Sequence, residues 1–171
     1  MQRKYVVRTI TVIGSSQASP EQIQTAEEVG RVLADCRVRL ISGGRGGVME
    51  AVARAHSEGG GESIGILPGL DKSDANRYNT INITTGLGTG RNLINVLSGE
   101  GVIVVGGAAG TLSELAFSIL YNRPILLCSF LKGASAIPPE ILQQIAPQAN
   151  LTFVQSESEL KKAIPEWLHN L

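Results

Sequence analysis

The sequence predicts an α/β protein built as a three-layer α/β/α sandwich, with a mostly parallel sheet of about six or seven strands. Short apolar runs rich in β-branched residues alternate along the chain with longer segments of helical spacing. Several runs are apolar at every position, which is typical of parallel strands buried on both faces. The 171 residues are one domain's length, and no linker or repeat divides them, so a single domain is expected over residues 1–171.

The clearest strand is the run Val-Ile-Val-Val at residues 102–105, which ends at Gly106 and Gly107. A helix is expected to follow from Gly110 to Tyr121. The free N–H groups and the positive dipole end of such a helix favour a phosphate or another oxyanion. The loop matches neither standard phosphate motif, because no lysine follows Gly110 and the spacing is not GxGxxG.

The remaining elements are expected in the following order. The N-terminal half should contain strands at 9–13, 38–41, 63–67 and 81–84, helices at 20–35, 48–57 and 93–97, and a polar loop or lid at 71–79. Ser19, Pro20 and Gln22 form a capping box at the first helix. The C-terminal part should contain strands at 125–128 and 152–154, a flexible segment at 133–139, a short helix from 140 and a last helix through 167.

Three glycine-rich loops follow strands, at residues 14–16, 42–47 and 106–111. In a parallel sheet the carboxyl ends of the strands share one edge, and ligands bind where the strand order reverses. The loops are therefore expected to meet in one cleft that holds a phosphate-bearing small molecule. The fold expected from this arrangement is Rossmann-like.

The composition excludes several kinds of partner. Fifteen basic and 15 acidic residues give a net charge of zero, so neither nucleic acid nor a membrane surface is an expected partner. The opening MQRKYVVRTI lacks a signal-peptide core and no run is long enough to span a bilayer, which predicts a cytoplasmic protein. Cys36 and Cys128 are expected as free thiols, and His56 and His169 as surface or helix-end residues. No cluster with metal-ligand spacing is present, so no protein-ligated metal is expected.

The candidate ligand-binding residues come from the three loops, from the position just before the helix expected at 93–97, and from the helix expected at 110–121. They are Gly14, Ser15, Ser16, Gly43, Gly44, Arg45, Gly46, Arg91, Gly106, Gly107, Ala108, Ala109, Gly110, Thr111 and Glu114. Most of these residues also have a simpler interpretation that involves no ligand. Ser15 and Ser16 could form a plain turn, Arg45 and Arg91 could be solvated, and Thr111 with Glu114 could be a capping box. If the protein is an enzyme, Arg91 and Glu114 are the expected catalytic pair, with Arg91 orienting the carboxylate.

Over almost the full chain, these segments resemble the LOG group, once mislabelled lysine decarboxylases. The resemblance is carried by residues 14–16 (GSS), 42–49 (SGGRGGVM), 64–68 (IGILP), 91–92 (RN) and 106–114 (GGAAGTLSE). In the LOG signature a proline precedes the glycines and a lysine follows the arginine, whereas Val105 and Asn92 stand here. The segment DANRYNTINITTGLGTGRN is more similar to a sister branch that includes molybdenum cofactor carrier proteins.

The resemblance implies two functions. The leading one is a carrier that binds the molybdenum cofactor as cargo and stores or delivers it without turnover, with molybdoenzymes as recipients. The second is a phosphoribohydrolase that releases free base and ribose 5-phosphate from nucleoside 5'-monophosphates, for which Glu114 would stabilise an oxocarbenium-like transition state or activate water. A nucleotide-sensing module that neither carries nor cuts is a third interpretation.

The helix expected from Gly110 to Tyr121 carries Leu115, Phe117, Ile119 and Leu120 around much of its surface. A helix that is apolar on more than one face needs a second partner besides the sheet. A homodimer or a dimer of dimers is therefore expected, in line with the resemblance. The alternative is burial of the whole helix within one subunit.

Overall fold

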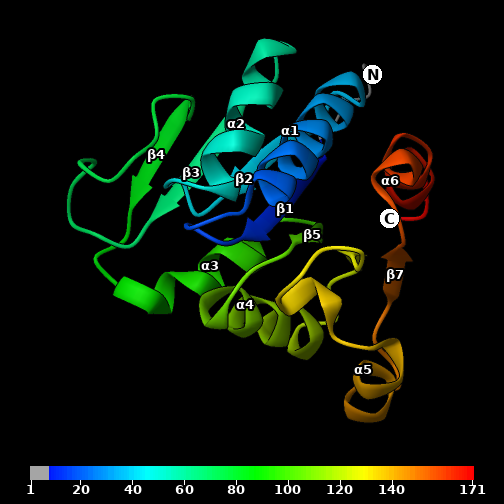
Figure 1. The fold of residues 1–171 in the computed structure, drawn as a ribbon. Helices are drawn as coiled ribbons and strands as arrows, with labels where there is room; N and C mark the ends of the chain where they lie inside the picture. The colour runs from blue at the N-terminus through cyan, green and yellow to red at the C-terminus, as the bar shows by residue number, and fades with distance from the viewer. Residues whose placement is uncertain (1–7) are drawn as a thin grey trace, which may run out of the picture.

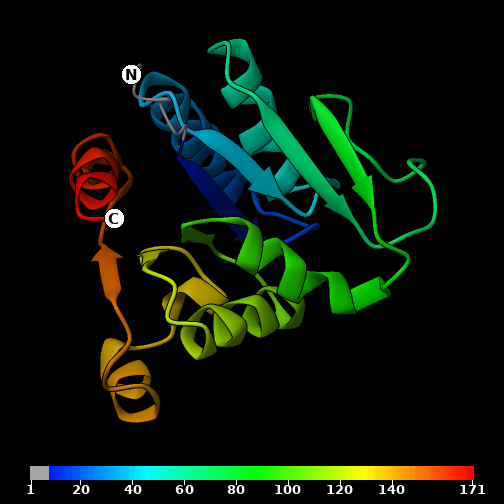
Figure 2. The same cartoon turned by 180° about the vertical axis from the view of Figure 1, so that it is seen from behind.

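The computed structural model describes residues 8–171, which form one sheet with helices on both of its faces (Figure 1). The strands are β1 (Thr9–Gly14), β2 (Arg39–Ser42), β3 (Ser63–Leu67), β4 (Ile81–Thr84), β5 (Gly101–Val105), β6 (Ile125–Cys128) and β7 (Leu151–Val154). Their order is β4-β3-β2-β1-β5-β6-β7, so β4 and β7 are the two edges (Figure 2). Each of the six pairings is parallel. The predicted Rossmann-like α/β fold is confirmed.

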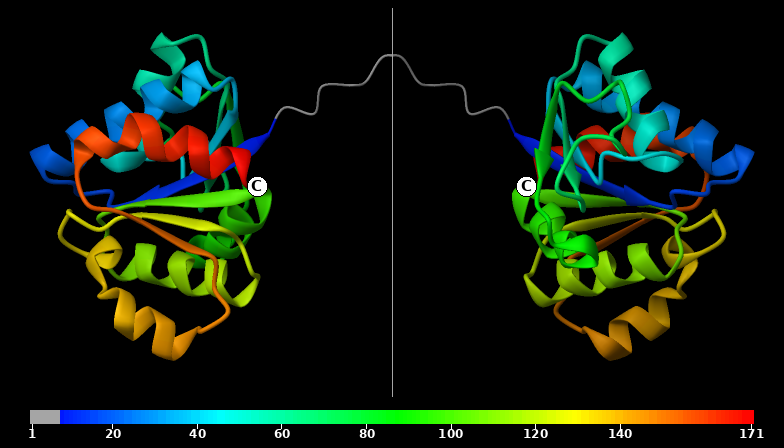
Figure 3. Two further views of the ribbon diagram at one scale, coloured as in Figure 1. Left: turned by 90° about the vertical axis from the view of Figure 1, so that its right-hand side faces the viewer. Right: turned by 90° about the vertical axis from the view of Figure 1, so that its left-hand side faces the viewer.

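The helices are divided between the two faces of the sheet, as the side views show (Figure 3). One face is covered by α1 (Pro20–Asp35), α2 (Val48–Glu58) and α6 (Leu160–His169), and the other by α3 (Arg91–Ser98), α4 (Ala109–Leu120) and α5 (Pro139–Ile145). Short 3-10 turns lie at Gly88–Gly90, Ala134–Ala136 and Glu157–Glu159. Every residue of β5 and β6 is buried, which explains why these strands are apolar without alternation.

Local capping signals at α1 act as predicted. The side chain of Ser19 accepts a hydrogen bond from the backbone N–H of Gln22, and the side chain of Gln22 accepts one from the backbone of Ser19. Pro20 is the first helical residue, where its missing N–H costs nothing. These contacts satisfy donors that a helix start otherwise leaves free.

The segment at 133–139 differs from the expected flexible connection. Ala134 and Ser135 are buried in a 3-10 turn that packs on the loop after β5. The backbone N–H of Ala134 donates to the carbonyl of Gly107, and that of Ser135 donates to the carbonyl of Gly106. The segment therefore supports the glycine loop.

The strand order places the topological switch point between β1 and β5. From β1 the chain builds the sheet outward to β4, and then returns through α3 to pair β5 with the other side of β1. The loops that leave β1 and β5 consequently run to opposite faces, which opens a crevice at the carboxyl ends of these strands.

The sequence predicted neither a signal peptide nor a membrane-spanning segment. Part of that prediction concerns residues 1–7, which lie outside the described part. Within residues 8–171, no helix is both long enough and apolar enough to cross a bilayer. The two cysteines are free, with Cys128 buried and Cys36 half-buried.

His56 lies in the last turn of α2, which agrees with the helix-end alternative of the prediction, but it is buried and not on the surface. Its Nε2 is 3.0 Å from the carbonyl of Val38 and its Nδ1 is 3.1 Å from the hydroxyl of Ser63. A carbonyl can only accept, so Nε2 carries the hydrogen and Nδ1 accepts from Ser63. The ring also fills the space beside Gly61, where a Cβ would collide with it. Burial lowers the pKa of His56 below its ordinary value of 6.5.

We expect this histidine to make the protein less stable in acid. The unfolded chain takes up a proton near the ordinary pKa of 6.5, which folded His56 resists, so stability falls as the pH drops through 6.5 until the folded-state pKa is passed. Urea midpoints measured from about pH 8 to about pH 5 should fall more steeply for the wild type than for His56→Gln. Equal slopes in the two proteins would contradict this assignment.

Candidate functional site

A cleft of about 220 Å³ opens at the switch point, at the carboxyl end of the sheet. It lies between the loops after β1, β2 and β5 and the first turns of α3 and α4, so the three glycine-rich loops converge on one site. Its lining residues are Val12, Ile13, Gly14, Ser15, Ser16, Gly43, Arg45, Met49, Pro68, Gly88, Thr89, Arg91, Asn92, Asn95, Ala108, Gly110, Thr111 and Glu114. The volume is small for a ligand site, so a larger ligand would extend from the mouth.

The structure brings most of the predicted site residues together in this cleft. Ten of them line it: Gly14, Ser15, Ser16, Gly43, Arg45, Arg91, Ala108, Gly110, Thr111 and Glu114. Five do not, although they belong to the same loops: Gly44, Gly46, Gly106, Gly107 and Ala109. Of the second group, Gly44, Gly106 and Gly107 shape the backbone of the loops, with positive φ angles.

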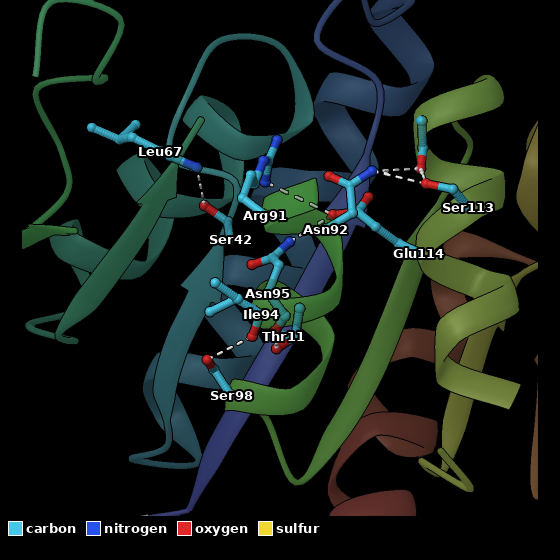
Figure 4. Close-up of polar contacts among 12 residues, drawn as sticks. Thr11, Ser42, Leu67, Arg91, Asn92, Ile94, Asn95, Ser98, Ser113 and Glu114 are labelled. Carbon is cyan, nitrogen blue, oxygen red and sulfur yellow. Dashed lines mark hydrogen bonds and ion pairs between the residues drawn. The ribbon is translucent and has the colours of Figure 1, made fainter. Parts of the chain in front are cut away.

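Arg91 is the first residue of α3, two positions earlier than the predicted helix start, and it points into the crevice (Figure 4). Its side chain is 11% exposed. The guanidinium packs directly on Gly43, where a Cβ would collide with it. Gly43 is not among the glycines with positive φ, so it is required for the space that it leaves and not for its backbone angles.

Glu114, on the second turn of α4, faces Arg91 across the crevice (Figure 4). Its side chain is 7% exposed, and its Oε1 lies 3.8 Å from Nη1 of Arg91, which is an ion pair but not a hydrogen bond. Asn95 lies between them and donates from Nδ2 to the same Oε1 at 2.7 Å. We call Arg91, Asn95 and Glu114 the inner wall of the cleft.

The inner wall is anchored to the sheet through α3. The hydroxyl of Thr11 on β1 donates to the backbone carbonyl of Asn95 at 2.8 Å, and the hydroxyl of Ser118 donates to the backbone carbonyl of Glu114 at 2.7 Å. Thr11 and Ser118 are fully buried. The first hydrogen bond ties α3 to β1, whereas the second lies within α4. The side chains of Asn92 and Asn95 then join α3 to α4 and so position the carboxylate.

Burial and charge act in opposite directions on the ion pair. Desolvation raises the pKa of Glu114, while the Asn95 hydrogen bond and the charge of Arg91 oppose that rise. Desolvation likewise lowers the pKa of Arg91, against the attraction of Glu114. Removing either partner would leave a buried charge without compensation.

The start of α4 overturns the expected capping box. The helix begins at Ala109, its N-cap is Ala108, and no side chain caps it. Thr111 is therefore within the first turn, and Glu114 is directed to Asn95 and Arg91 instead of back to a cap. The first-turn N–H groups are left for another acceptor, at a point where Ala108, Ala109 and Gly110 are exposed.

At the mouth of the cleft, Arg45 is 43% exposed and forms an ion pair with Asp74 at 3.4 Å. Asn76 reaches the same loop, since its Nδ2 donates to the carbonyl of Arg45 and its backbone N–H to the carbonyl of Gly44. Asn79 adds a second hydrogen bond to Gly44. The segment expected as a loop or lid thus binds the β2–α2 loop and holds Arg45 at the entrance.

The loop after β5 is supported by close contacts with residues 133–135. Gly106 and Gly107 have positive φ angles of 60° and 102°, which strongly favour glycine. A Cβ at Gly133 would collide with the carbonyl of Gly107. The hydroxyl of Ser135 accepts from the N–H of Gly106 and donates to the carbonyl of Cys128. These glycines shape the loop without touching the ligand space.

Several lining residues were missed by reasoning from sequence. Asn95 is the most important, and its only signal was a polar residue four positions after Arg91 on the same helix face. Asn92 had been noted only as a replacement for lysine, yet it links α3 to α4 by donating to the hydroxyl of Ser113 at 2.8 Å. Met49 and Thr89 lie in segments that carry the family resemblance, but neither was predicted as a site residue.

No group of three or more His, Cys, Asp or Glu side chains is placed to hold a metal ion within residues 8–171. Glu114 is the single acidic residue among the described residues that line the cleft. The arrangement can bind an anion at the start of α4 and near Arg45, and can offer a buried carboxylate beside a cation deeper inside.

The fold and cleft together define a Rossmann-like protein with a small-molecule site at its switch point and a buried arginine–glutamate pair. Residues 7–163 match the model of the SLOG cluster4 family, and the chain belongs to that family. The predicted resemblance to the LOG-like superfamily is thereby confirmed. A relative in Archaeoglobus fulgidus, an uncharacterized protein, is 37% identical over 134 residues, which are 78% of this chain and 83% of that protein.

Two solved structures are similar over nearly their full length. The molybdenum cofactor binding protein of the phototrophic bacterium Rippkaea orientalis superposes with a TM-score of 0.85 at 30% identity, covering 96% of this chain and 99% of that one. The molybdenum cofactor carrier protein of Chlamydomonas reinhardtii superposes with a TM-score of 0.81 at 27% identity, covering 95% and 99%. The carrier branch suggested by the sequence is thus supported by structure.

We expect Asn95→Asp to destabilise the protein by on the order of 3 kcal/mol at neutral pH, because it places a second buried carboxylate against Glu114. Urea denaturation would measure the loss. The double variant Asn95→Asp with Glu114→Gln is the control: an amide then donates to a carboxylate again, and most of the stability should return. Equal losses in the single and double variants would show that this contact does not matter.

Proposed function

We propose that the protein binds the molybdenum cofactor and carries it in the cytoplasm, with the cofactor's phosphate at the start of α4. The observation that carries the proposal is the cleft at the switch point, which is lined by the uncapped start of α4 and by Arg45. The similarity to cofactor-binding and carrier proteins at 27 to 30% identity supports the same ligand. Molybdoenzymes that receive the cofactor are the partners this function implies.

The residues present fit such a cargo. Gly110 has open space beside its Cα, so a phosphate can approach the backbone of the first turn of α4. Thr111 lines the cleft and can add a hydroxyl donor. The molybdenum arrives inside its pterin ligand, so the chain needs no metal ligands of its own.

The inner wall supports a second candidate function, the nucleoside 5'-monophosphate phosphoribohydrolase. Arg91 and Glu114 lie in the cleft as an ion pair at 3.8 Å, which is the arrangement needed to hold a carboxylate near a ribose anomeric carbon. The ordinary means of glycoside cleavage is a pair of carboxylates, whereas the cleft is lined by one among the described residues. This favours the carrier over the nucleoside 5'-monophosphate phosphoribohydrolase.

We expect Gly43→Ala to weaken binding of the molybdenum cofactor about tenfold, or about 1.4 kcal/mol, because the new Cβ displaces the guanidinium of Arg91. Gly46→Ala is the matched control in the same loop, since a Cβ there meets nothing closer than 3.9 Å. Wild type and control should bind the cofactor saturably and slow its oxidative decay.

Absence of binding and protection by the wild type would reject the carrier. Incubation with AMP gives the opposing test: release of free adenine that disappears in Glu114→Ala would assign the hydrolase instead. No release by a folded protein that binds the cofactor would assign the carrier.

We further propose that α3 and α4 form the interface of a homodimer. Two such homodimers could assemble into a dimer of dimers. The helices run side by side in the same direction, because Asn92 contacts Ser113 at their starts and Arg123 donates to the carbonyl of Leu97 at their ends. Their outer surface exposes Leu112 by 47% and Leu120 by 70%. A second copy would cover this apolar surface.

Leu120→Glu is expected to convert the dimer to a monomer, because it places a charge in the centre of the apolar contact. Sedimentation should give twice 18.1 kDa for the wild type and 18.1 kDa for the variant. Glu140→Gln, on exposed α5, is a control that should remain dimeric. An 18.1 kDa wild type at micromolar concentration would reject the interface.

A further inference from the structure

The inner wall has hydrogen-bonding capacity that the chain itself leaves unused. Asn95 occupies Oε1 of Glu114, and within residues 8–171 no hydrogen bond reaches Oε2. The guanidinium of Arg91 approaches the carboxylate only to 3.8 Å and donates no hydrogen bond within the same residues. Among the described residues, Nη1 of Arg91 and Oδ1 of Asn95 are buried without a hydrogen-bond partner. An unpaired donor therefore lies beside two free acceptors, Oδ1 of Asn95 and Oε2 of Glu114, at the deep end of the cleft.

This end of the cleft is unsuitable for a phosphate. Glu114 already balances the charge of Arg91, so this end of the cleft offers no net positive charge to a phosphate, and little water screens the phosphate from the carboxylate. The start of α4 and the half-exposed Arg45 favour an anion instead. A ligand with one charged end and one uncharged end is thus oriented: its phosphate lies towards the mouth, and its uncharged end meets the inner wall.

The chemistry of the inner wall specifies that uncharged end. A carboxylate oxygen accepts N–H donors, and an arginine beside it donates to a carbonyl. The complementary group has N–H donors beside a carbonyl acceptor, as on the 2-aminopyrimidin-4-one edge that pterins and guanine share. Adenine presents one amino donor beside a ring nitrogen whose lone pair would face the carboxylate.

The wall is rigid enough to discriminate between these edges. Thr11 fixes the backbone of Asn95 to β1 with a buried hydroxyl, and Asn95 in turn holds the carboxylate of Glu114. Gly43 holds the guanidinium plane against the β2–α2 loop. An unmatched edge would therefore leave polar groups unpaired, which is the usual source of strong rejection in a hydrogen-bonding site.

We infer that Arg91, Asn95 and Glu114 recognise a 2-aminopyrimidin-4-one edge, with the phosphate of the same ligand held outward near Arg45. The inference builds on the proposed function, because it specifies which end of the cargo enters first. It also predicts selectivity: pterins and guanine nucleotides bind, and adenine nucleotides are rejected. Asn95 is a positioning residue, since it directs Oε2 of Glu114 towards the ligand by occupying Oε1.

The test is a calorimetric comparison of ligands that differ only at this edge. GMP should bind at least tenfold more tightly than AMP, with IMP, which lacks the 2-amino group, between them. 6-Hydroxymethylpterin should bind at least tenfold more tightly than its 2,4-diamino analogue. The tighter of the pterin and guanine series identifies the source of the edge. Equal binding of GMP and AMP, and of the two pteridines, would overturn the inference.

Variants separate the two ends of the ligand. Glu114→Gln, with its folding checked by thermal denaturation, should remove the GMP-over-AMP preference, and Asn95→Ala should reduce it. Arg45→Ala should keep that preference and instead shrink the advantage of GMP over guanosine. A preference that survives in Glu114→Gln would overturn the inference.

These outcomes are distinct from failure of the carrier function. If the wild type binds the molybdenum cofactor while Glu114→Gln keeps the base preference, the edge recognition is wrong and the carrier stands. If the cofactor does not bind but GMP is preferred over AMP, the edge recognition stands and the carrier is wrong.

Discussion

The structure depends on one constraint: a carboxylate and a guanidinium are buried together at the carboxyl end of the sheet. Glu114 and Arg91 are each about nine-tenths buried, and neither can be left without a partner. Asn95 supplies the hydrogen bond that the arginine does not reach. Gly43 has no Cβ, which leaves the space that the guanidinium occupies. One buried ion pair therefore constrains which residues can stand in the β2–α2 loop, in α3 and in α4.

The sheet order makes this burial possible. Because β5 pairs with β1 on the side opposite β2, α3 and α4 lie together on one face and both begin at the switch point. Arg91 opens one helix, and Glu114 lies just over one turn into the other. The topology brings the two helix starts together, and the hydrogen bonds of Asn92 and Asn95 to α4 set how they face each other. The glycines that do not touch the cleft, Gly106 and Gly107, allow the chain to turn from β5 into α4 within this narrow space.

Most of the fold was predictable from sequence because its signals are local. The apolar runs mark the strands, and Ser19 and Gln22 mark the start of α1 within four residues. The failures involve contacts between distant segments. His56 is buried against Val38, eighteen positions earlier, which accepts its hydrogen bond. The start of α4 at Ala109 has no side-chain cap, and the loop before it is bonded by the distant 134–135 turn. Asn95 acts through a residue nineteen positions later. Short sequence patterns do not predict contacts between residues that are far apart in the chain.

The pairing of β1 with β5 also has a consequence for the order of folding. Ile10 lies beside Gly101, ninety-one residues later, so this contact closes a long loop and is slow to form compared with helices and neighbouring strands. The N-terminal strands can assemble into a half-sheet before then, but the crevice needs both halves. A ligand therefore binds only the completed topology, and its binding energy stabilises that state and none of its precursors. During synthesis, the chain becomes competent for its ligand only after β5 and α4 have left the ribosome.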